Sequence, residues 1–318
     1  MKTLIAAAVA AITLGGAATA QDTFPSGPVT IIVPYSPGGA TDRTARALAT
    51  ELETVWSQPI VVENRPGAGS MIGTALLARA KPDGQTLMIN TAAFSTAPAL
   101  QSDLPFDPKA DITPIMMISA SPYTAVAGTN VKAKSFSEFF AEAKERPMFF
   151  ATAGVGSSSH LMAELLIQQA GLDAEVVHFS GGGDAQTNLM GGHADVYIST
   201  TQSVMPYANN GQVTALGVLG EERFGLLPDL EATGESDVQG IEVDGWNGLF
   251  GPGGMSPDLV AQVAEGVRKA MESDGFRKNL EENFVEAGTL EGQEFADMVY
   301  AETETWRKLA EERGITAN

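Results

Sequence analysis

Short apolar runs rich in β-branched residues alternate with segments of helical periodicity, and this alternation limits the fold of the chain more than any other feature. Near the start, apolar runs at 29–35, 59–65 and 85–91 are separated by helical patterns at 41–56 and 70–80. Within the first helical pattern, apolar residues recur every three to four positions, so one face of that helix packs on a sheet. The pattern predicts a βαβαβ unit with a parallel sheet.

A second series of the same kind begins at residue 123 and predicts a second α/β lobe. From Pro257 onward the chain is predicted to be nearly all helical, with Ser256 as an N-cap and Gly314 as a stop. The expected strands of the second series lie at 123–128, 148–154, 175–180 and 194–200, and its expected helices at 135–143, 160–170 and 184–190.

Two lobes are also expected from the length of 318 residues, which exceeds the usual size of a single core. The apolar stretch at 112–128 is too long for one ordinary strand, and 241–252 is suited to a returning strand; two such crossings make a hinge. We therefore expect one discontinuous lobe from 21–122 and 247–318, and a second lobe from 123–246.

The first twenty residues have the features of a secretory signal peptide. Lys2 precedes an apolar stretch at 4–14, and Ala18-Thr19-Ala20 forms a cleavage site. This predicts export to the periplasm after cleavage near Ala20. The apolar stretch is too short to span a bilayer. Since the chain has no cysteine, it must be stable without disulfides, and thiol nucleophiles and thiolate metal sites are excluded.

The formal net charge is −20, from 19 basic and 39 acidic residues. No basic face is available to neutralise phosphates, which argues against nucleic-acid binding. An anionic ligand is still allowed, because surface carboxylates are screened within about 8–10 Å in physiological salt. No motif for a metal or a cofactor is present, so we expect neither, and we take a monomer as the default state.

Each lobe carries one glycine-rich loop where a strand leads into a helix, the usual place for ligands in open α/β sheets. Neither loop contains Lys or Arg before its helix, so backbone N–H groups, hydroxyls and helix dipoles would hold a carboxylate. The second loop lacks the glycine and lysine patterns of nucleotide-binding loops. The expected ligand-binding residues are Tyr35, Ser36, Pro37, Gly38, Gly39, Thr41 and Asp42 in the first loop, and Thr152, Ala153, Gly154, Gly156, Ser157, Ser158 and Ser159 in the second.

Polar segments after other strands are further candidates for the cleft. The segments lie at 90–93, 180–184 and 199–203, and the residues expected on the ligand are Thr91 and Ala92 from the first and Ser199, Thr200 and Thr201 from the last. Ser and Thr at such positions equally often cap the next helix, and both explanations remain open. A charge pair on a helix face is usually solvated, so Arg43 is expected to pair with Asp42 or a surface carboxylate and not with ligand.

A serine hydrolase is the enzymatic alternative. His160 follows Ser157, Ser158 and Ser159, but adjacent residues at a helix start rarely form a nucleophile and base, and no G-x-S-x-G elbow is present. His160, His178 and His193 also lack the spacing of a metal site. We therefore expect no enzymatic activity.

Seven stretches of the chain, running nearly end to end, carry a family resemblance. PGGATDRTAR, VVENRPGAG and KPDGQT are the most specific motifs, and TAGVGSSSH, HFSGGGDAQTNLMGGHADV and WNGLFGPGG extend the match. The chain resembles the Bug-type solute-binding proteins of tripartite tricarboxylate transporters. The resemblance implies a type II periplasmic binding protein fold whose two α/β lobes close around one carboxylate, and it implies no cofactor.

In this family the two glycine-rich loops grip the carboxylate, often through ordered water. Residue by residue, the resemblance points to Pro37, Gly38, Gly39 and Thr41, and to Gly156, Ser157 and Ser158. The family often has an aspartate where this chain has Ser199. The resemblance therefore does not extend to ligands whose amino or hydroxyl group binds that aspartate.

The implied ligand is a di- or tricarboxylate, an aromatic acid or an acidic amino acid. The implied partners are membrane permease subunits of such a transporter. Signalling to a membrane sensor kinase is the alternative.

Overall fold

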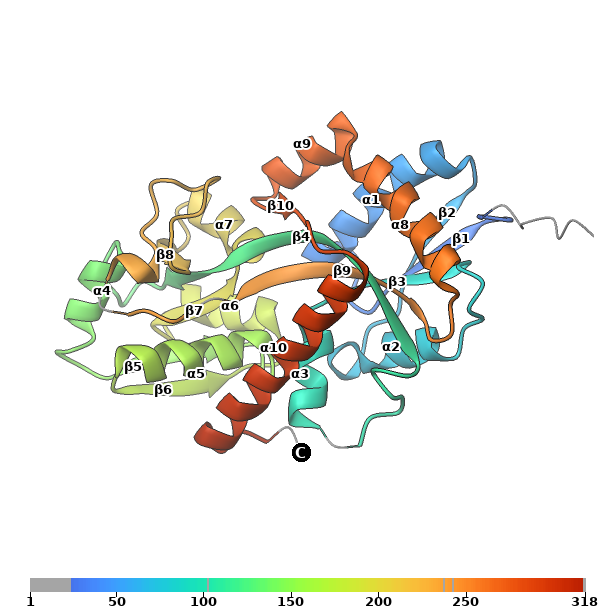
Figure 1. Ribbon diagram of the computed structural model, residues 1–318. Coiled ribbons are helices and arrows are strands. Elements are labelled where there is room, and N and C mark those ends of the chain that lie inside the picture. The colour runs from blue at the N-terminus through green and yellow to red at the C-terminus, as the bar shows by residue number, and fades with distance from the viewer. Residues whose placement is uncertain (1–23, 102, 237, 242, 317–318) are drawn as a thin grey trace, which may run out of the picture.

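The structure is a computed structural model that describes residues 24–316 except 102, 237 and 242, so the expected signal peptide lies outside the described residues. Within this range the fold is α/β, with a sheet in the order β2-β1-β3-β9-β4-β7-β5-β6, from which β8 and β10 branch by pairing with β4 (Figure 1). The first part of the chain forms β1 (Val29–Val33), α1 (Ala40–Trp56), β2 (Ile60–Asn64), η1 (Ala68–Ser70), α2 (Met71–Ala78), β3 (Thr86–Thr91) and α3 (Ala93–Leu100).

Two long strands cross from one lobe to the other, as expected. β4 (Ile112–Ala127) pairs antiparallel with β9 (Asp244–Pro252) over Ile112–Pro122, and with β7 and β8 over Tyr123–Ala127. β9 in turn pairs with β3. The two strands run side by side through the middle of the molecule in Figure 1. The predicted crossing strands are therefore confirmed.

The second lobe follows the predicted alternation of strands and helices, with two additions. These are α7, which contains Pro206, and β8, and neither was predicted from the sequence. The helix expected at 160–170 begins two residues earlier, at Ser158. The elements are α4 (Phe136–Glu142), β5 (Met148–Thr152), α5 (Ser158–Ala170), β6 (Ala174–His178), α6 (Gly182–Met190), β7 (Val196–Thr200), α7 (Thr201–Asn209), β8 (Thr214–Leu219) and η2 (Thr233–Glu235).

The C-terminal part is mostly helical and packs against both lobes. It contains α8 (Pro257–Met271), α9 (Asp274–Glu282), the two-residue β10 (Glu286–Ala287) and α10 (Gly292–Arg313). Ser256 caps α8 by accepting a hydrogen bond from Leu259 N, and Gly314 ends α10 in the left-handed conformation, both as predicted. None of the described helices is both long and apolar enough to cross a membrane.

The hydrophobic core is divided between the lobes. One cluster packs α1 and α8 on the first part of the sheet, with Leu48 and Val263 fully buried. Another fills the second lobe around Phe150 and Leu161. α10 contributes to two clusters: Phe295 lies with Trp246 beside the crossing strands, whereas Trp306 belongs to the second lobe's cluster. The exact lobe boundaries stay a prediction, and α10 ties the lobes together.

Candidate ligand-binding site

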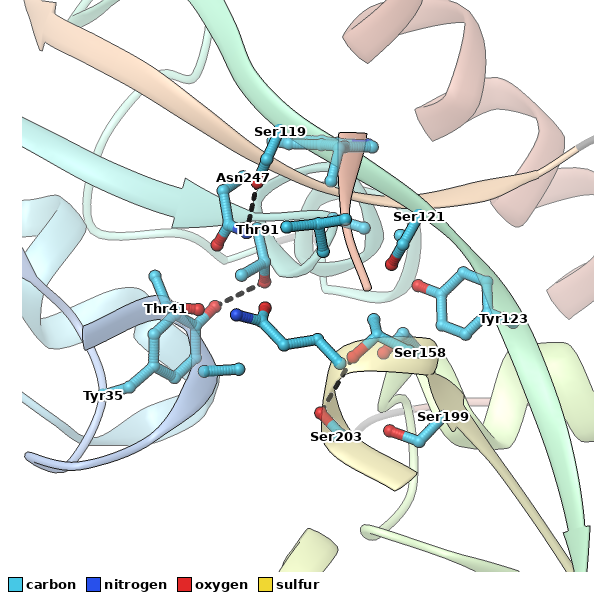
Figure 2. Close-up of a pocket in the computed structure, with 17 residues that line it drawn as sticks. Tyr35, Thr41, Thr91, Ser119, Ser121, Tyr123, Ser158, Ser199, Ser203 and Asn247 are labelled. Atoms are coloured by element: carbon cyan, nitrogen blue, oxygen red, sulfur yellow. Dashed lines mark hydrogen bonds between the residues drawn. The ribbon is translucent and has the colours of Figure 1, made fainter. Parts of the chain in front are cut away.

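A cavity of about 160 Å³ lies where the two lobes and the crossing strands meet. Figure 2 shows Tyr35, Thr41 and Thr91 on one side and Ser158, Ser199 and Ser203 on the other, with β4 running past them. Side chains of the crossing strands complete the wall. The hydroxyl and amide groups lining this inner cavity belong to Tyr35, Thr41, Thr91, Ser119, Ser121, Tyr123, Ser158, Ser199, Thr200, Gln202, Ser203 and Asn247.

The inner cavity has no charged side chain among the described residues that line it. In a chain with 58 charged residues (19 basic plus 39 acidic), this is a strong local bias. A ligand in the cavity is therefore contacted by neutral donors and acceptors. No carboxylate of the described lining residues repels an acidic ligand there or competes with it for hydrogen-bond donors.

Two helices from opposite lobes begin at the inner cavity. α1 begins at Ala40, and its N-cap Gly39 supplies no side-chain cap. The first intrahelical hydrogen bond of α1 runs from Arg43 N to Gly39 O at 3.0 Å, so the amides of Ala40 and Thr41 have no intrahelical partner. α5 begins at Ser158, which also lines the cavity. Free N–H groups and the positive ends of two helix dipoles thus face the same space.

The first glycine-rich loop is held by Asp42, which is 2% exposed and does not line the inner cavity. Its Oδ2 accepts from Gly38 N at 2.8 Å, and Arg46 donates to both of its oxygens at 3.0 and 2.9 Å. Asn64 Nδ2 donates to Oδ1 at 2.9 Å. Burial opposes ionisation, but the hydrogen bonds from Arg46, Gly38 and Asn64 hold the pKa of Asp42 below its usual value. Asp42 therefore shapes the loop in this structure.

Arg46, and not Arg43, pairs with Asp42, and no carboxylate of the described residues pairs with Arg43, so the expected pairing of Arg43 with Asp42 or a surface carboxylate is wrong. The residues are four apart in the observed pair, the spacing at which side chains on a helix meet. Arg43 instead donates to Gly38 O at 3.0 Å and to Asn283 Oδ1 at 3.4 Å.

The second glycine-rich loop is closed by hydrogen bonds within itself. Ala153 N donates to Ser159 Oγ at 2.8 Å, and the Ser157 hydroxyl donates to Gly154 O at 2.7 Å. Thr152 Oγ1 lies 2.8 Å from His178 Nδ1. Ser158 is the residue of this loop that lines the inner cavity. The other residues position the start of α5.

These contacts also differ from those of a serine hydrolase. His160 Nδ1 accepts a hydrogen bond from Gly156 N at 3.0 Å, and His160 Nε2 faces Glu164 Oε1 at 3.6 Å. Both ring nitrogens therefore have partners other than a serine hydroxyl. The arrangement lacks the serine-to-histidine proton path that a catalytic triad requires.

Tyr35 connects the first loop to the strand end behind it. Its hydroxyl donates to Asn90 Oδ1 at 2.8 Å and lies 2.7 Å from Thr91 Oγ1. Burial raises the pKa of Tyr35 to about 12, and burial likewise raises the pKa of Tyr123. Both phenols are therefore neutral near pH 7 and can act as hydrogen-bond donors.

An outer cavity of about 490 Å³, here called the mouth, adjoins the inner cavity. The two share Ala40, Ser199, Gln202 and Ser203. Of the residues expected from the sequence, the structure places Tyr35, Thr41, Thr91, Ala92, Ser158, Ser199 and Thr200 on the inner cavity and Gly38, Gly39 and Ser199 on the mouth.

The remaining expected residues line neither cavity. Thr201 is one of them, and its hydroxyl donates to Pro122 O at 2.7 Å, fastening α7 to β4. The group comprises Ser36, Pro37, Asp42, Thr152, Ala153, Gly154, Gly156, Ser157, Ser159 and Thr201.

Several lining residues were missed because they lie on the crossing strands. Ser119, Ser121 and Tyr123 alternate along β4 and so share one face of it. This period-two pattern within 112–128 was a usable signal. Asn247 reaches the cavity from β9, where its Nδ2 donates to Ser119 Oγ at 3.0 Å. Gln202 and Ser203 also line the inner cavity, and they belong to the polar segment expected at 199–203.

Two α/β lobes joined by crossing strands, with a polar cavity between them, define the type II periplasmic binding protein fold. Residues 44–315 match the family model of the tripartite tricarboxylate transporter family receptor. The chain belongs to this receptor family.

Relatives and solved structures agree with this assignment. BugT of Bordetella pertussis is 30% identical over 261 residues, covering 81% of this chain and 80% of BugT. A UPF0065 protein of Pseudomonas sp. strain P51 is 30% identical over 320 residues, covering 100% of this chain and 95% of that protein. The resemblance to Bug-type proteins is thus confirmed.

Solved structures of similar proteins cover most of the chain. The periplasmic binding protein BugD matches with a TM-score of 0.80 at 29% identity, covering 92% of this chain and 99% of BugD. MatC from Rhodopseudomonas palustris with bound malate has a TM-score of 0.78 at 30% identity, covering 90% and 99%. A further R. palustris protein with adipate has a TM-score of 0.83 at 27% identity, covering 92% and 99%. The matching family is described as one of receptors, and BugD is described as a periplasmic binding protein.

Proposed function

We propose that this chain is an extracytoplasmic solute-binding protein that captures a small organic carboxylate between its lobes and delivers it to a tripartite tricarboxylate-type membrane transporter. The observation that carries the proposal is that α1 and α5 begin, from opposite lobes, at one inner cavity without a charged side chain. Unpaired amides at helix N-termini favour anions. Neutral donors bind an acid reversibly, which suits a protein that must release its cargo.

The size of the inner cavity favours a small ligand. Its volume of about 160 Å³ is below the roughly 300–1,000 Å³ of typical drug-sized sites. It is close to the ~150 Å³ of an engineered cavity that holds benzene. A ligand body of about six non-hydrogen atoms therefore fits inside, and a longer ligand would extend into the mouth. Malate and adipate, the ligands named for two solved relatives, support this size class.

Membership of the receptor family supports delivery to permease subunits as the physiological role. The signal-peptide pattern at 1–20 supports export of this chain to the periplasm after cleavage near Ala20. Lobe closure on the ligand, by bending of β4 and β9, would present the surface that a permease recognises.

A thermal-shift screen of the purified mature chain, residues 21–318, tests the proposal. The panel contains malate, adipate, citrate, benzoate and glutamate, with adipamide and glucose as neutral controls. A carboxylate at 100 times its dissociation constant should add about 2.7 kcal/mol to the free energy of unfolding. Stabilisation by acids but not by adipamide or glucose supports the proposal. Stabilisation by glucose alone, or by no compound of the panel, overturns it.

A further inference from the structure

The mouth differs from the inner cavity in one respect, which is charge. Arg43 is the single charged side chain among the described residues that line either cavity. The protein carries a net charge of −20, so a cation at the opening of an otherwise uncharged cleft is a local exception. An acidic ligand that extends out of the inner cavity would meet this cation.

The guanidinium of Arg43 has no carboxylate partner among the described residues. It donates hydrogen bonds to the neutral oxygens of Gly38 and Asn283, at 3.0 and 3.4 Å. Most other arginines of the described chain form ion pairs, Arg46 with Asp42 and Arg146 with Asp195 among them. Since a guanidinium has five N–H donors, Arg43 keeps donors and a full charge for a further partner.

The spacing along α1 places Arg43 beside the amides that face the inner cavity. Ala40 is the first residue of α1 and lines both cavities, and Arg43 lies three positions further on. Residues three apart are neighbours on a helix surface. An elongated ligand with one carboxylate at the start of α1 therefore has its other end near the guanidinium of Arg43.

The second lobe supplies a matching set of polar groups across the mouth. α6 begins there with Gly182 and Gly183, and its N-cap Gly181 makes no side-chain cap bond. Gln202, which is 4% exposed, lines both cavities, and its side chain makes one hydrogen bond to the described residues, a long one of 3.5 Å to Thr44 Oγ1. Its buried carboxamide therefore retains hydrogen-bonding capacity toward the cleft.

We propose that the mouth is a second anion subsite, built on Arg43, which takes the far carboxylate of an elongated dicarboxylate whose near carboxylate lies at the starts of α1 and α5. This rests on the proposed function. The two subsites work differently: the inner one uses neutral donors, and the outer one uses a charge-assisted hydrogen bond. Arg43 is then the residue that makes the protein prefer dicarboxylates over monocarboxylates of the same chain length.

Isothermal titration calorimetry on the mature protein measures how much each end of the ligand contributes to affinity. The probes are succinate, glutarate and adipate, each with its monocarboxylate counterpart: butyrate, pentanoate and hexanoate. The variants are Arg43→Gln and Arg43→Lys, with Arg79→Gln as the matched control, because Arg79 is an exposed arginine of the same part of the chain that lines neither cavity. Unliganded melting temperatures check that each variant folds.

We expect the wild type to bind at least one dicarboxylate more tightly than its counterpart. Arg43→Gln should weaken that dicarboxylate about tenfold and the monocarboxylate less than twofold, with Arg43→Lys in between and Arg79→Gln unchanged. If Arg43→Gln weakens the dicarboxylate and the monocarboxylate equally, Arg43 acts on the loop or through long-range attraction of anions, and the proposal is overturned. An unchanged dicarboxylate affinity in Arg43→Gln also overturns it. If the wild type binds both acids equally, the subsite fails while the proposed function stands. If it binds no acid, the proposed function itself fails.

Discussion

Trp246 Nε1 donates a hydrogen bond of 2.9 Å to Glu302 Oε2, which joins the wall of the inner cavity to α10. Glu302 is 9% exposed, and burial raises its pKa to about 7 against the opposing hydrogen bonds of Ser95 and Trp246. Ser95 Oγ lies 2.8 Å from Glu302 Oε2 and 2.7 Å from Ala92 O, and one hydroxyl proton cannot serve both. A protonated Glu302 can donate to Ser95 and resolve this conflict.

The raised pKa of Glu302 makes stability depend on pH. Between its unfolded value of 4.5 and about 7, the native state binds more protons than the unfolded state, so the free energy of unfolding falls as pH rises. A shift of this size corresponds to at most about 3–4 kcal/mol. We expect Glu302→Gln to be similar to wild type at pH 4.5 and more stable at pH 8, in urea denaturation at both values. A difference that does not grow with pH would contradict the assignment.

Removing one backbone donor at the start of α1 should weaken ligand binding without unfolding the helix. Ala40 is the first helical position, where proline is tolerated, and Gly39 before it has the extended conformation that precedes proline (φ −71°, ψ 172°). Ala40→Pro should weaken carboxylate binding roughly tenfold, the loss expected for one hydrogen bond to a charged group. Calorimetry measures the loss.

Asp274→Pro is the matched control for this substitution. Asp274 is the first residue of α9, follows the extended Ser273 (φ −64°, ψ 146°) and lines neither cavity. Asp274→Pro should leave the affinity for carboxylates unchanged. If Ala40→Pro folds and binds as wild type does, the amide of Ala40 takes no part in binding.

A negative charge placed in the inner cavity should repel an acidic ligand. Ser199 lines both cavities, and no described residue around the inner one is charged. Like charges at an effective dielectric constant of about 20 repel by a few kcal/mol at contact distances. Ser199→Asp should therefore weaken plain carboxylates at least tenfold and acidic amino acids less, while Ser199→Ala should change affinity little. Equal affinity of Ser199→Asp and Ser199→Ala for adipate would place the ligand away from β7.

The two adjacent glycines of the first loop should tolerate alanine differently. Gly38 has φ of +81°, which is unfavourable for an L-residue although an added Cβ meets no atom within 4 Å. Gly39 has φ of −71°, and its Cβ would make an ordinary 3.5 Å contact with Ser36 O. Gly38→Ala should cost about 1–2 kcal/mol, and Gly39→Ala close to none. Chemical denaturation of the pair measures this, and equal stabilities would contradict the loop conformation.

The elements that could be predicted from the sequence are those specified by local signals. The cap at Ser256 and the stop at Gly314 are short-range features, and both were placed correctly. α5 begins earlier than expected because each of several consecutive serines can act as a cap, and Ser157 is the one that accepts from His160 N. α7 was not predicted because it contains Pro206, and proline is unfavourable inside a helix.

The parts of the site that escaped prediction depend on contacts distant in sequence. Ser119 faces Asn247 only because β4 and β9 pair in a particular antiparallel register. Asp42 was expected on the ligand, and its partner Asn64 lies on β2, so its role follows from how β2 packs beside α1. Sequence periodicity identifies neither the register of a long-range pair nor the partners of a buried carboxylate.

A crystal structure of the mature protein with its tightest-binding acid would show whether the starts of α1 and α5 hold the ligand together. We expect a ligand carboxylate within hydrogen-bond distance, directly or through one ordered water, of the amides at Ala40 or Thr41 and of the start of α5 at Ser158. A carboxylate bound to one lobe alone, or outside the inner cavity, would contradict it.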